Sequence, residues 1–228
     1  MQSLNKNYPA KERYQDYKVA QSYDKERFSS FLGRIVDRLE KHALNKALKH
    51  IDKNSLILDL PCGTGRITEF LLQKGYFVVG ADISEAMIAI AKEKLQKFSG
   101  FKGIFRTDAE NLSFLDKSFD YSVSVRLMGH LPPDIRIKIL QEMRRVTKKQ
   151  IVVTFYITDL FTKISKFIQR KGKKIDQPLY PIPMRYLEDE ISKAGLKIVK
   201  IIPMLKFISE CHYLILEPKT DETFRLFK

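Results

Sequence analysis

The sequence predicts an α/β domain with a doubly wound, mostly parallel sheet, and three observations support this fold class. Two short apolar runs, residues 56–59 and 76–82, each end in an aspartate, as buried parallel strands do when both their faces are covered. A glycine-rich turn after the first run leads directly into a helix-like segment. Further strand-like and helix-like segments alternate along the chain, and 228 residues suffice for one such domain with a full core.

The first fifty residues precede the sheet and are expected to form a helical cap. A helix from about residue 32 to residue 50 carries Ile35, Leu39, Leu44 and Leu48 on a roughly helical period. Several tyrosine and phenylalanine side chains come before it, between residues 14 and 31. The first strand, residues 56–59, follows this cap.

The turn after the first strand reads Asp59-Leu60-Pro61-Cys62-Gly63-Thr64-Gly65-Arg66. Its glycines let the backbone turn sharply and approach a ligand, and Asp59 stands at the strand end, where open α/β sheets bind ligands. A dinucleotide site is the obvious alternative, but its fingerprint needs a third glycine at position 68, which is Thr68. An acid just before the glycines would also repel a pyrophosphate, whereas it suits the ammonium group of a methionine moiety.

Three more strands with functional loops are predicted downstream. Residues 76–82 end in Asp82, and Ser84 is the expected N-cap of a helix through about residue 96. A carboxylate after the second strand of a nucleotide-binding fold typically accepts the ribose hydroxyls. Residues 101–107 predict the third strand, before Asp108 and Ala109, and residues 118–125 predict the fourth, before the loop 126–131.

These segments, in this order over residues 56–131, resemble the class I S-adenosylmethionine-dependent methyltransferases. Pro61 replaces the family's usual first glycine, while Gly63 and Gly65 are retained. The resemblance implies an enzyme that uses S-adenosylmethionine as its methyl donor. It also implies a seven-stranded sheet of order 3-2-1-4-5-7-6 with an antiparallel last strand.

The resemblance also assigns donor-binding residues. Asp108 is expected near the adenine amino group and Ala109 on the ring face. Residues 19–28 resemble the N-terminal segment that folds over the donor in many small-molecule methyltransferases, where Tyr23 and Arg27 would reach the donor's carboxylate; mere packing of these aromatic residues on the core is the alternative. The full donor set expected is Tyr23, Arg27, Asp59, Pro61, Cys62, Gly63, Gly65, Asp82, Ile83, Met87, Asp108, Ala109 and Arg126.

The rest of the chain completes a single methyltransferase domain. A helix begins at Pro132-Pro133, residues 150–156 form the fifth strand, residues 184–194 form a helix ended by Gly195, and residues 196–202 and 208–216 form the last strands. The expected parts are an N-terminal cap (1–50), a donor-binding core (51–156), an insertion (157–183) and a C-terminal helix with strands (184–228). The insertion has apolar residues at helical spacing among lysines and arginines, which predicts an amphipathic basic helix. We expect this helix to act as a lid over the acceptor pocket. The alternatives are a surface helix packed on its apolar side and a contact with a membrane surface.

Two residues are candidates for catalysis. His130, just past the fourth strand, has a side chain that titrates near neutral pH and is the first candidate for a general base. Tyr156, at the end of the fifth strand, is the second. A packed or capping role is the alternative for His130. No metal site is expected, because two cysteines are too few for a zinc site or a disulfide framework.

The sequence indicates the chemical class of the methyl acceptor but not its identity. No Asn-Pro-Pro-Tyr or Asp-Pro-Pro-Tyr tetrad follows the fourth strand, so methylation of exocyclic amines of bases is disfavoured, and neither cysteine lies on an acceptor-side loop. The net charge of +14 favours an anionic partner. We therefore expect a small-molecule or lipid-like acceptor methylated on oxygen, nitrogen or carbon. A methyltransferase acting on RNA or a protein side chain is the second hypothesis, and a non-catalytic binding module is the remote third.

The location of the protein is also an expectation from the sequence. No run of about 18 apolar residues predicts a transmembrane segment, and the first residues lack the apolar core of a signal peptide. A cytoplasmic protein is therefore expected. The identity of the acceptor, the pathway and the oligomeric state stay open at this stage.

Overall fold

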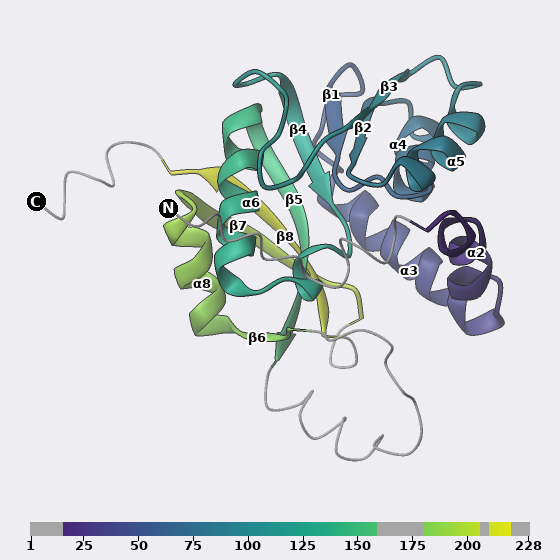
Figure 1. The fold of residues 1–228 in the computed structure, drawn as a ribbon. Helices are drawn as coiled ribbons and strands as arrows, with labels where there is room; N and C mark the ends of the chain where they lie inside the picture. Colours follow the sequence, from purple (N-terminus) through teal and green to yellow (C-terminus); the bar gives the residue numbers. More distant parts are fainter. Residues whose placement is uncertain (1–15, 159–179, 206–209, 220–228) are drawn as a thin grey trace, which may run out of the picture.

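The computed structural model describes residues 16–158, 180–205 and 210–219. Its centre is a sheet of strand order β3-β2-β1-β4-β5-β8-β7, with the short β6 paired to β5 (Figure 1). The strand β8 runs antiparallel to its neighbours β5 and β7, and every other pair in this sheet is parallel. With the two-residue β6 set aside, this is the predicted order 3-2-1-4-5-7-6 with an antiparallel last strand, so the predicted fold class is confirmed.

The strands match the predicted segments closely, apart from an earlier start of β5, the short β6, which was not predicted, and β8, which was predicted over residues 208–216. The strands are β1 Leu56–Asp59, β2 Phe77–Asp82, β3 Phe101–Arg106, β4 Phe119–Ser124, β5 Thr147–Thr158, β6 Ile182–Pro183, β7 Leu196–Pro203 and β8 Cys211–Pro218. The strand β5 begins earlier than predicted because its polar start, Thr147 to Gln150, gives no apolar signal. Thr147 is nevertheless buried and hydrogen-bonds to Ser122 Oγ at 2.5 Å.

The helices are α2 Tyr17–Phe28, α3 Phe31–Ala47, α4 Arg66–Gln73, α5 Glu85–Leu95, the 3₁₀ turn η1 Met128–His130, α6 Pro133–Val146 and α8 Met184–Lys193. Side chains cap the first turns of α2, α3 and α5, whereas α4, α6 and α8 begin at a glycine or a proline without a side-chain cap. Ser84 accepts from the N–H of Met87 at 3.2 Å, which confirms it as the N-cap of α5. Pro133 starts α6, and Gly195 follows α8 with φ +72°, both as predicted.

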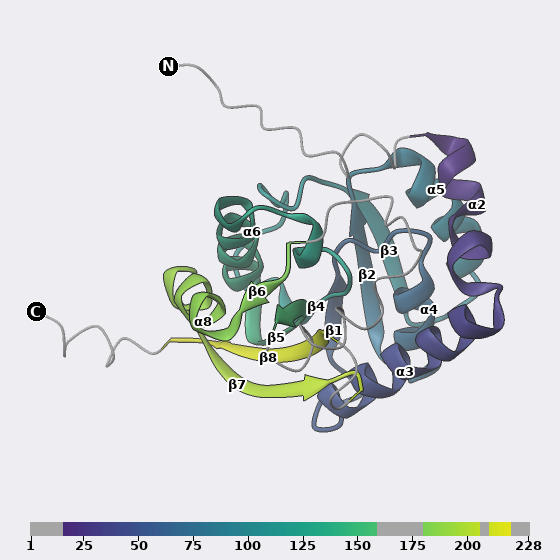
Figure 2. The same ribbon diagram turned by 90° about the horizontal axis from the view of Figure 1, so that it is seen from below.

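Helices cover both faces of the sheet, as Figure 2 shows: α6 and α8 on one side, and α3, α4 and α5 on the other. Neighbouring residues of one strand supply the two cores. Leu58 and Val153 pack with the helices α6 and α8, while Ile57 and Val152 pack with α3 and α4. Both faces of the central strands are therefore buried, which is why β1 and β5 carry continuous apolar runs.

The carboxyl ends of β1, β2 and β4 meet at one edge of the sheet. Asp59 is paired with Gly80 of β2 on one side and with Val123 of β4 on the other. The helix α2 packs on α5 beside this edge, through a small cluster formed by Ala20, Ala86 and Met87. The loops that follow the three strands are thus brought together under α2.

The segment for which an amphipathic lid was predicted, apart from residues 157–158 and 180–183, lies outside the described residues. Among the helices that the structure does describe, none is long and apolar enough to cross a lipid bilayer.

Candidate functional site

A cavity of about 140 Å³ opens at the carboxyl edge of β1, β2 and β4. Four parts of the chain meet there: the glycine loop with the start of α4, the loop after β2, the loop after β4, and α2. The lining residues are Tyr23, Pro61, Cys62, Gly63, Thr64, Arg66, Ile67, Asp82, Ile83, Met87, Val125, Arg126, Leu127 and His130. Most of the predicted donor set and the first catalytic candidate therefore share one cavity.

The glycine loop is pinned between the neighbouring strands. The N–H of Leu60 donates to Val123 O at 2.9 Å, and the N–H of Cys62 donates to Ala81 O at 2.8 Å. Gly63 has φ +53°, and no atom lies within 4 Å of the position that a Cβ would occupy. Its bare backbone therefore leaves open space beside the cavity, which any other residue would partly fill at the cost of a strained φ.

Asp82 is held in place by the backbone on both of its oxygens. Oδ2 accepts from the N–H of Gly63 at 2.8 Å, and Oδ1 accepts from the N–H of Ser84 at 2.9 Å. Burial raises the pKa of this carboxyl, while these N–H groups oppose that shift. A carboxylate accepts about four hydrogen bonds. The N–H of Ile83 opposes the shift as well, so three backbone donors leave Asp82 room for about one further hydrogen bond, which fits a ribose hydroxyl.

Asp59 lies in the core beneath the loop rather than on the cavity wall. It is fully buried, and Thr68 Oγ1 donates to its Oδ2 at 2.6 Å. Its Oδ1 has no hydrogen-bond partner among the described residues. Burial raises the pKa of Asp59 to about 7. A cation bound nearby would favour the ionised form, which fits the ammonium group of a methionine moiety.

The helix α2 is tied to the glycine loop. Thr64 Oγ1 lies 2.9 Å from both carboxylate oxygens of Asp24 and donates to them. This contact places Tyr23 on the cavity wall. Arg27 does not line the cavity itself; its guanidinium stacks over the Tyr23 ring at 5.0 Å from the centroid. The expected pair, Tyr23 and Arg27, is therefore brought together at the cavity mouth.

Sequence reasoning missed an ion-pair cluster that is centred on Glu40 of α3. This side chain is 1% exposed; its Oε1 accepts from Arg126 Nε at 2.6 Å and its Oε2 from Arg66 Nη2 at 3.0 Å. Arg66 also pairs with Asp37 at 2.6 Å. The Phe28 ring contacts both arginines, with its centroid 4.3 Å from Arg66 Cζ and 5.5 Å from Arg126 Cζ.

The remaining predicted residues divide between the cavity and its surroundings. His130 ends η1 and lines the cavity. Tyr156 does not line this cavity. Its ring packs directly on Gly129, where a Cβ would come within 2.5 Å of Tyr156 Cε2. Burial raises the pKa of Tyr156 to about 12, which makes this phenol a weak choice of base near neutral pH.

Three expected donor contacts also lie off the cavity wall. Gly65 is the N-cap of α4, with φ +80°. Asp108 and Ala109 follow β3 in a turn that is closed by a bridge between Asp108 and Asn111. Their roles stay predictions. Within the described ranges, no group of three or more histidine, cysteine, aspartate or glutamate side chains gathers in a way that could hold a metal ion.

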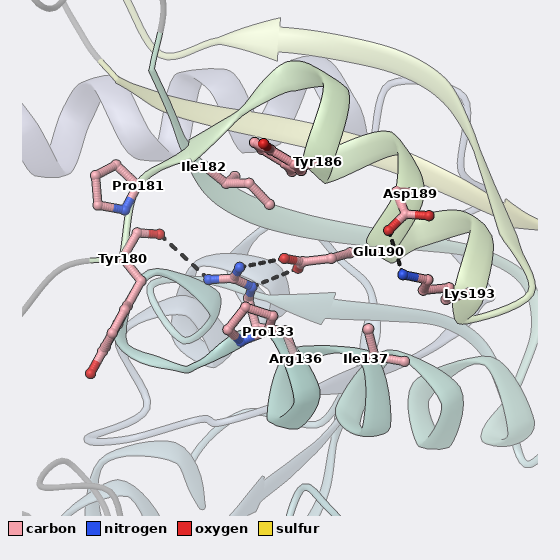
Figure 3. A pocket seen from close by; sticks show the side chains of 10 residues that line it. All are labelled: Pro133, Arg136, Ile137, Tyr180, Pro181, Ile182, Tyr186, Asp189, Glu190 and Lys193. Carbon is pink, nitrogen blue, oxygen red and sulfur yellow. Dashed lines mark hydrogen bonds and ion pairs between the residues drawn. The ribbon is translucent and has the colours of Figure 1, made fainter.

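A second cavity, of about 490 Å³, lies between α6 and α8 and shares no lining residue with the first (Figure 3). Beside it, Arg136 donates to both oxygens of Glu190, at 2.7 and 2.6 Å, and to Leu131 O at 2.9 Å. Both side chains are buried. This ion pair therefore joins α6, α8 and the loop before α6.

Comparisons with known proteins agree with this geometry. A family model described as a methyltransferase domain matches residues 57–150. The chain is 31% identical over 205 residues to the uncharacterized protein MJ1252 of Methanocaldococcus jannaschii, covering 80% of this chain and 74% of that one. It is 34% identical over 135 residues to a demethylmenaquinone methyltransferase of Staphylococcus epidermidis, covering 57% of this chain but only 53% of that relative.

The fold has a close counterpart among solved structures. Magnesium protoporphyrin IX methyltransferase from Synechocystis, solved with bound S-adenosylhomocysteine, superposes with a TM-score of 0.71 at 16% sequence identity. The match covers 90% of this chain and 98% of that one. Together with the strand order and the loop that presents Asp82, these matches identify the protein: it belongs to the class I S-adenosylmethionine-dependent methyltransferases.

Proposed function

We propose that the protein transfers the methyl group of S-adenosylmethionine to a small-molecule or lipid-like, anionic acceptor, on an oxygen, nitrogen or carbon atom. One observation carries this proposal: the cavity in which the Asp82 carboxylate, the bare backbone of Gly63 and the imidazole of His130 meet. The relatives named for menaquinone and protoporphyrin methylation support an acceptor of this class.

The cavity offers a complementary group for each part of the donor. Asp82 would accept a ribose hydroxyl, because its carboxylate lines the cavity and its three backbone contacts do not use all of its acceptor capacity. Ile83 and Met87 supply apolar surface beside it. Asp59 would balance the ammonium group, and Arg27 with Tyr23 would bind the carboxylate. When bound, S-adenosylmethionine supplies a methyl group already activated by the sulfonium.

The protein then has to align the acceptor, exclude water and remove one proton where the acceptor is protonated. Alignment alone supplies a large share of such accelerations. The tether from Thr64 to Asp24 holds α2 over the glycine loop and limits the access of water there. An imidazole nitrogen of His130 would take the acceptor's proton, since this side chain lines the cavity and a neutral imidazole can act as a general base.

Calorimetric titration with S-adenosylhomocysteine tests the donor site. We expect a Kd in the low micromolar range, about −7 to −9 kcal/mol. Asp82→Asn should weaken binding about 10- to 100-fold, because the variant loses the charged acceptor that faces the ribose. Asp116→Asn, on an exposed turn, is the matched control and should leave the Kd unchanged. No detectable binding to the wild-type protein would refute the proposal.

The acceptor class needs a separate experiment. The protein is incubated with donor carrying an isotope-labelled methyl group and with fractions of a cell extract. Label in the small-molecule or lipid fraction is the expected result. Label in RNA or protein would instead favour a macromolecular acceptor, for which the net charge of +14 is the supporting observation. Binding to bulk RNA that falls steeply with salt would belong with that second result.

A further inference from the structure

Arg126, on the loop after β4, has an unusual backbone conformation. Its φ is +64°, in the left-handed region that residues with a side chain rarely adopt. The conformation is held by its own N–H, which donates to Thr154 Oγ1 at 2.7 Å. A glycine would fill this position without strain, so the arginine side chain is retained at a cost in stability. Strained residues of this kind cluster at functional sites.

The side chain of Arg126 is oriented by its neighbours but not fully used by them. Glu40 accepts from Nε at 2.6 Å, and the Phe28 ring lies 5.5 Å from Cζ. Nη1 and Nη2 have no hydrogen-bond partner among the described residues, and Arg126 lines the cavity. A planar guanidinium whose two terminal nitrogens remain available matches the two oxygens of a carboxylate.

The ion pairs around Glu40 balance in charge at the buried part of the cluster, where Arg66 and Arg126 face Asp37 and Glu40. Lys41, which also pairs with Asp37, adds one positive charge on a side chain that is 30% exposed. This partly solvated charge attracts an anion to the cluster only modestly. The terminal nitrogens of Arg126 therefore carry the argument for a bound carboxylate.

We propose that Arg126 binds a carboxylate of the methyl acceptor and that Glu40 is its positioning residue. The inference rests on the proposed function, because the acceptor has to enter the cavity beside the bound donor. Arg27, stacked on Tyr23, is then the residue left for the donor's own carboxylate. The acceptor class follows from this assignment: a small molecule that carries a carboxylate close to the atom that is methylated.

The test uses a pair of probes that differ only in charge. Benzoate and benzamide are titrated, by saturation-transfer NMR, into protein already saturated with S-adenosylhomocysteine, so that the donor subsite is filled. The wild-type protein should bind benzoate about tenfold more tightly than benzamide, and Arg126→Gln should abolish this preference. Arg185→Gln, a change on the exposed surface of α8, is the matched control and should preserve it.

Glu40→Gln distinguishes the orientation of Arg126 by Glu40 from the effect of the Glu40 charge on anion binding. Removing this negative charge makes the cluster more positive, so electrostatics alone would strengthen benzoate binding. An amide offers one acceptor oxygen in place of two, so one of the two arginines loses its fixed partner. If Glu40 positions Arg126, benzoate affinity falls several-fold despite the added charge. A rise in affinity, in a variant that melts as a folded protein, would overturn the positioning role.

The donor titration distinguishes the remaining outcomes. Arg126 was expected among the donor contacts but is assigned to the acceptor in this proposal. Arg126→Gln should therefore change the Kd of S-adenosylhomocysteine by no more than about twofold. If it weakens that ligand but not 5′-methylthioadenosine, which lacks the amino-acid end, Arg126 serves the donor and the proposal is wrong. A wild-type protein that does not prefer benzoate over benzamide also overturns it. Failure to bind S-adenosylhomocysteine at all would instead refute the proposed function.

Discussion

Replacement of Asp59 by asparagine should remove the loss of stability that ionisation of this buried carboxyl causes as the pH rises. The pKa of Asp59 is raised by burial from 3.8 to about 7. The folded wild-type chain therefore holds this proton more tightly than the unfolded chain, and its stability falls as the pH rises from about 4 to about 7. Asp59→Asn carries no such proton. Its stability relative to the wild type should therefore increase over that pH range.

The magnitude follows from the pKa difference. The displacement from 3.8 to about 7 corresponds to about 4 kcal/mol of unfolding free energy at about 1.4 kcal/mol per pH unit. The variant also places an amide N–H₂ where Oδ1 now has no partner among the described residues, which costs about 1–3 kcal/mol at every pH. The free energy of unfolding of Asp59→Asn minus that of the wild type should therefore change by about 4 kcal/mol between pH 4 and pH 8, and this change is the quantity to measure.

Urea unfolding followed by far-ultraviolet circular dichroism measures this difference, since the chain has no tryptophan to report by fluorescence. Asp120→Asn is the control of opposite sign. Although partial burial opposes the shift, the N–H of Leu56 and the Lys148 ammonium lower the pKa of Asp120. That variant should therefore lose stability at neutral pH and match the wild type only in acid. A difference between Asp59→Asn and the wild type that stays constant from pH 4 to pH 8 would refute the reasoning.

Three further predictions concern catalysis and packing. His130→Gln should lower kcat about 10²- to 10⁴-fold in the labelled-methyl assay while the Kd of S-adenosylhomocysteine stays unchanged; loss of both together would indicate a structural role. Gly129→Ala should cost about 1–3 kcal/mol in urea unfolding, because its Cβ would meet the Tyr156 ring, and Tyr156→Leu in the same chain should recover part of this loss. Glu190→Gln should cost roughly 3–5 kcal/mol by leaving the Arg136 charge buried, whereas replacing both partners by methionine should cost much less; equal costs would contradict the structural role.

Short-range patterns in the sequence predicted the central strands of the fold and the loops of the site that hold Gly63, Asp82 and His130. The apolar run before Asp59 and the one before Asp82 each predict a buried strand, because residues a few positions apart set strand type, turn and helix cap. Parallel strands end at one edge, so the loops that hold Gly63, Asp82 and His130 could be expected to meet there. The N-cap at Ser84 was equally local, since its hydroxyl accepts from an N–H three residues away.

Only the tertiary structure decided what surrounds that edge. Glu40 occupies the buried stripe of α3 together with Ala43, Leu44 and Ala47, where the sequence pattern predicts an apolar residue. It is buried there because Arg66 and Arg126, 26 and 86 residues away along the chain, supply the compensating charge. No local pattern encodes a pairing of that range. The loops with Gly63 and Asp82 could thus be predicted from residues that are neighbours in the sequence. The orientation of Arg126 could not, because it depends on contact between α3 and the loop after β4, which forms only in the folded protein.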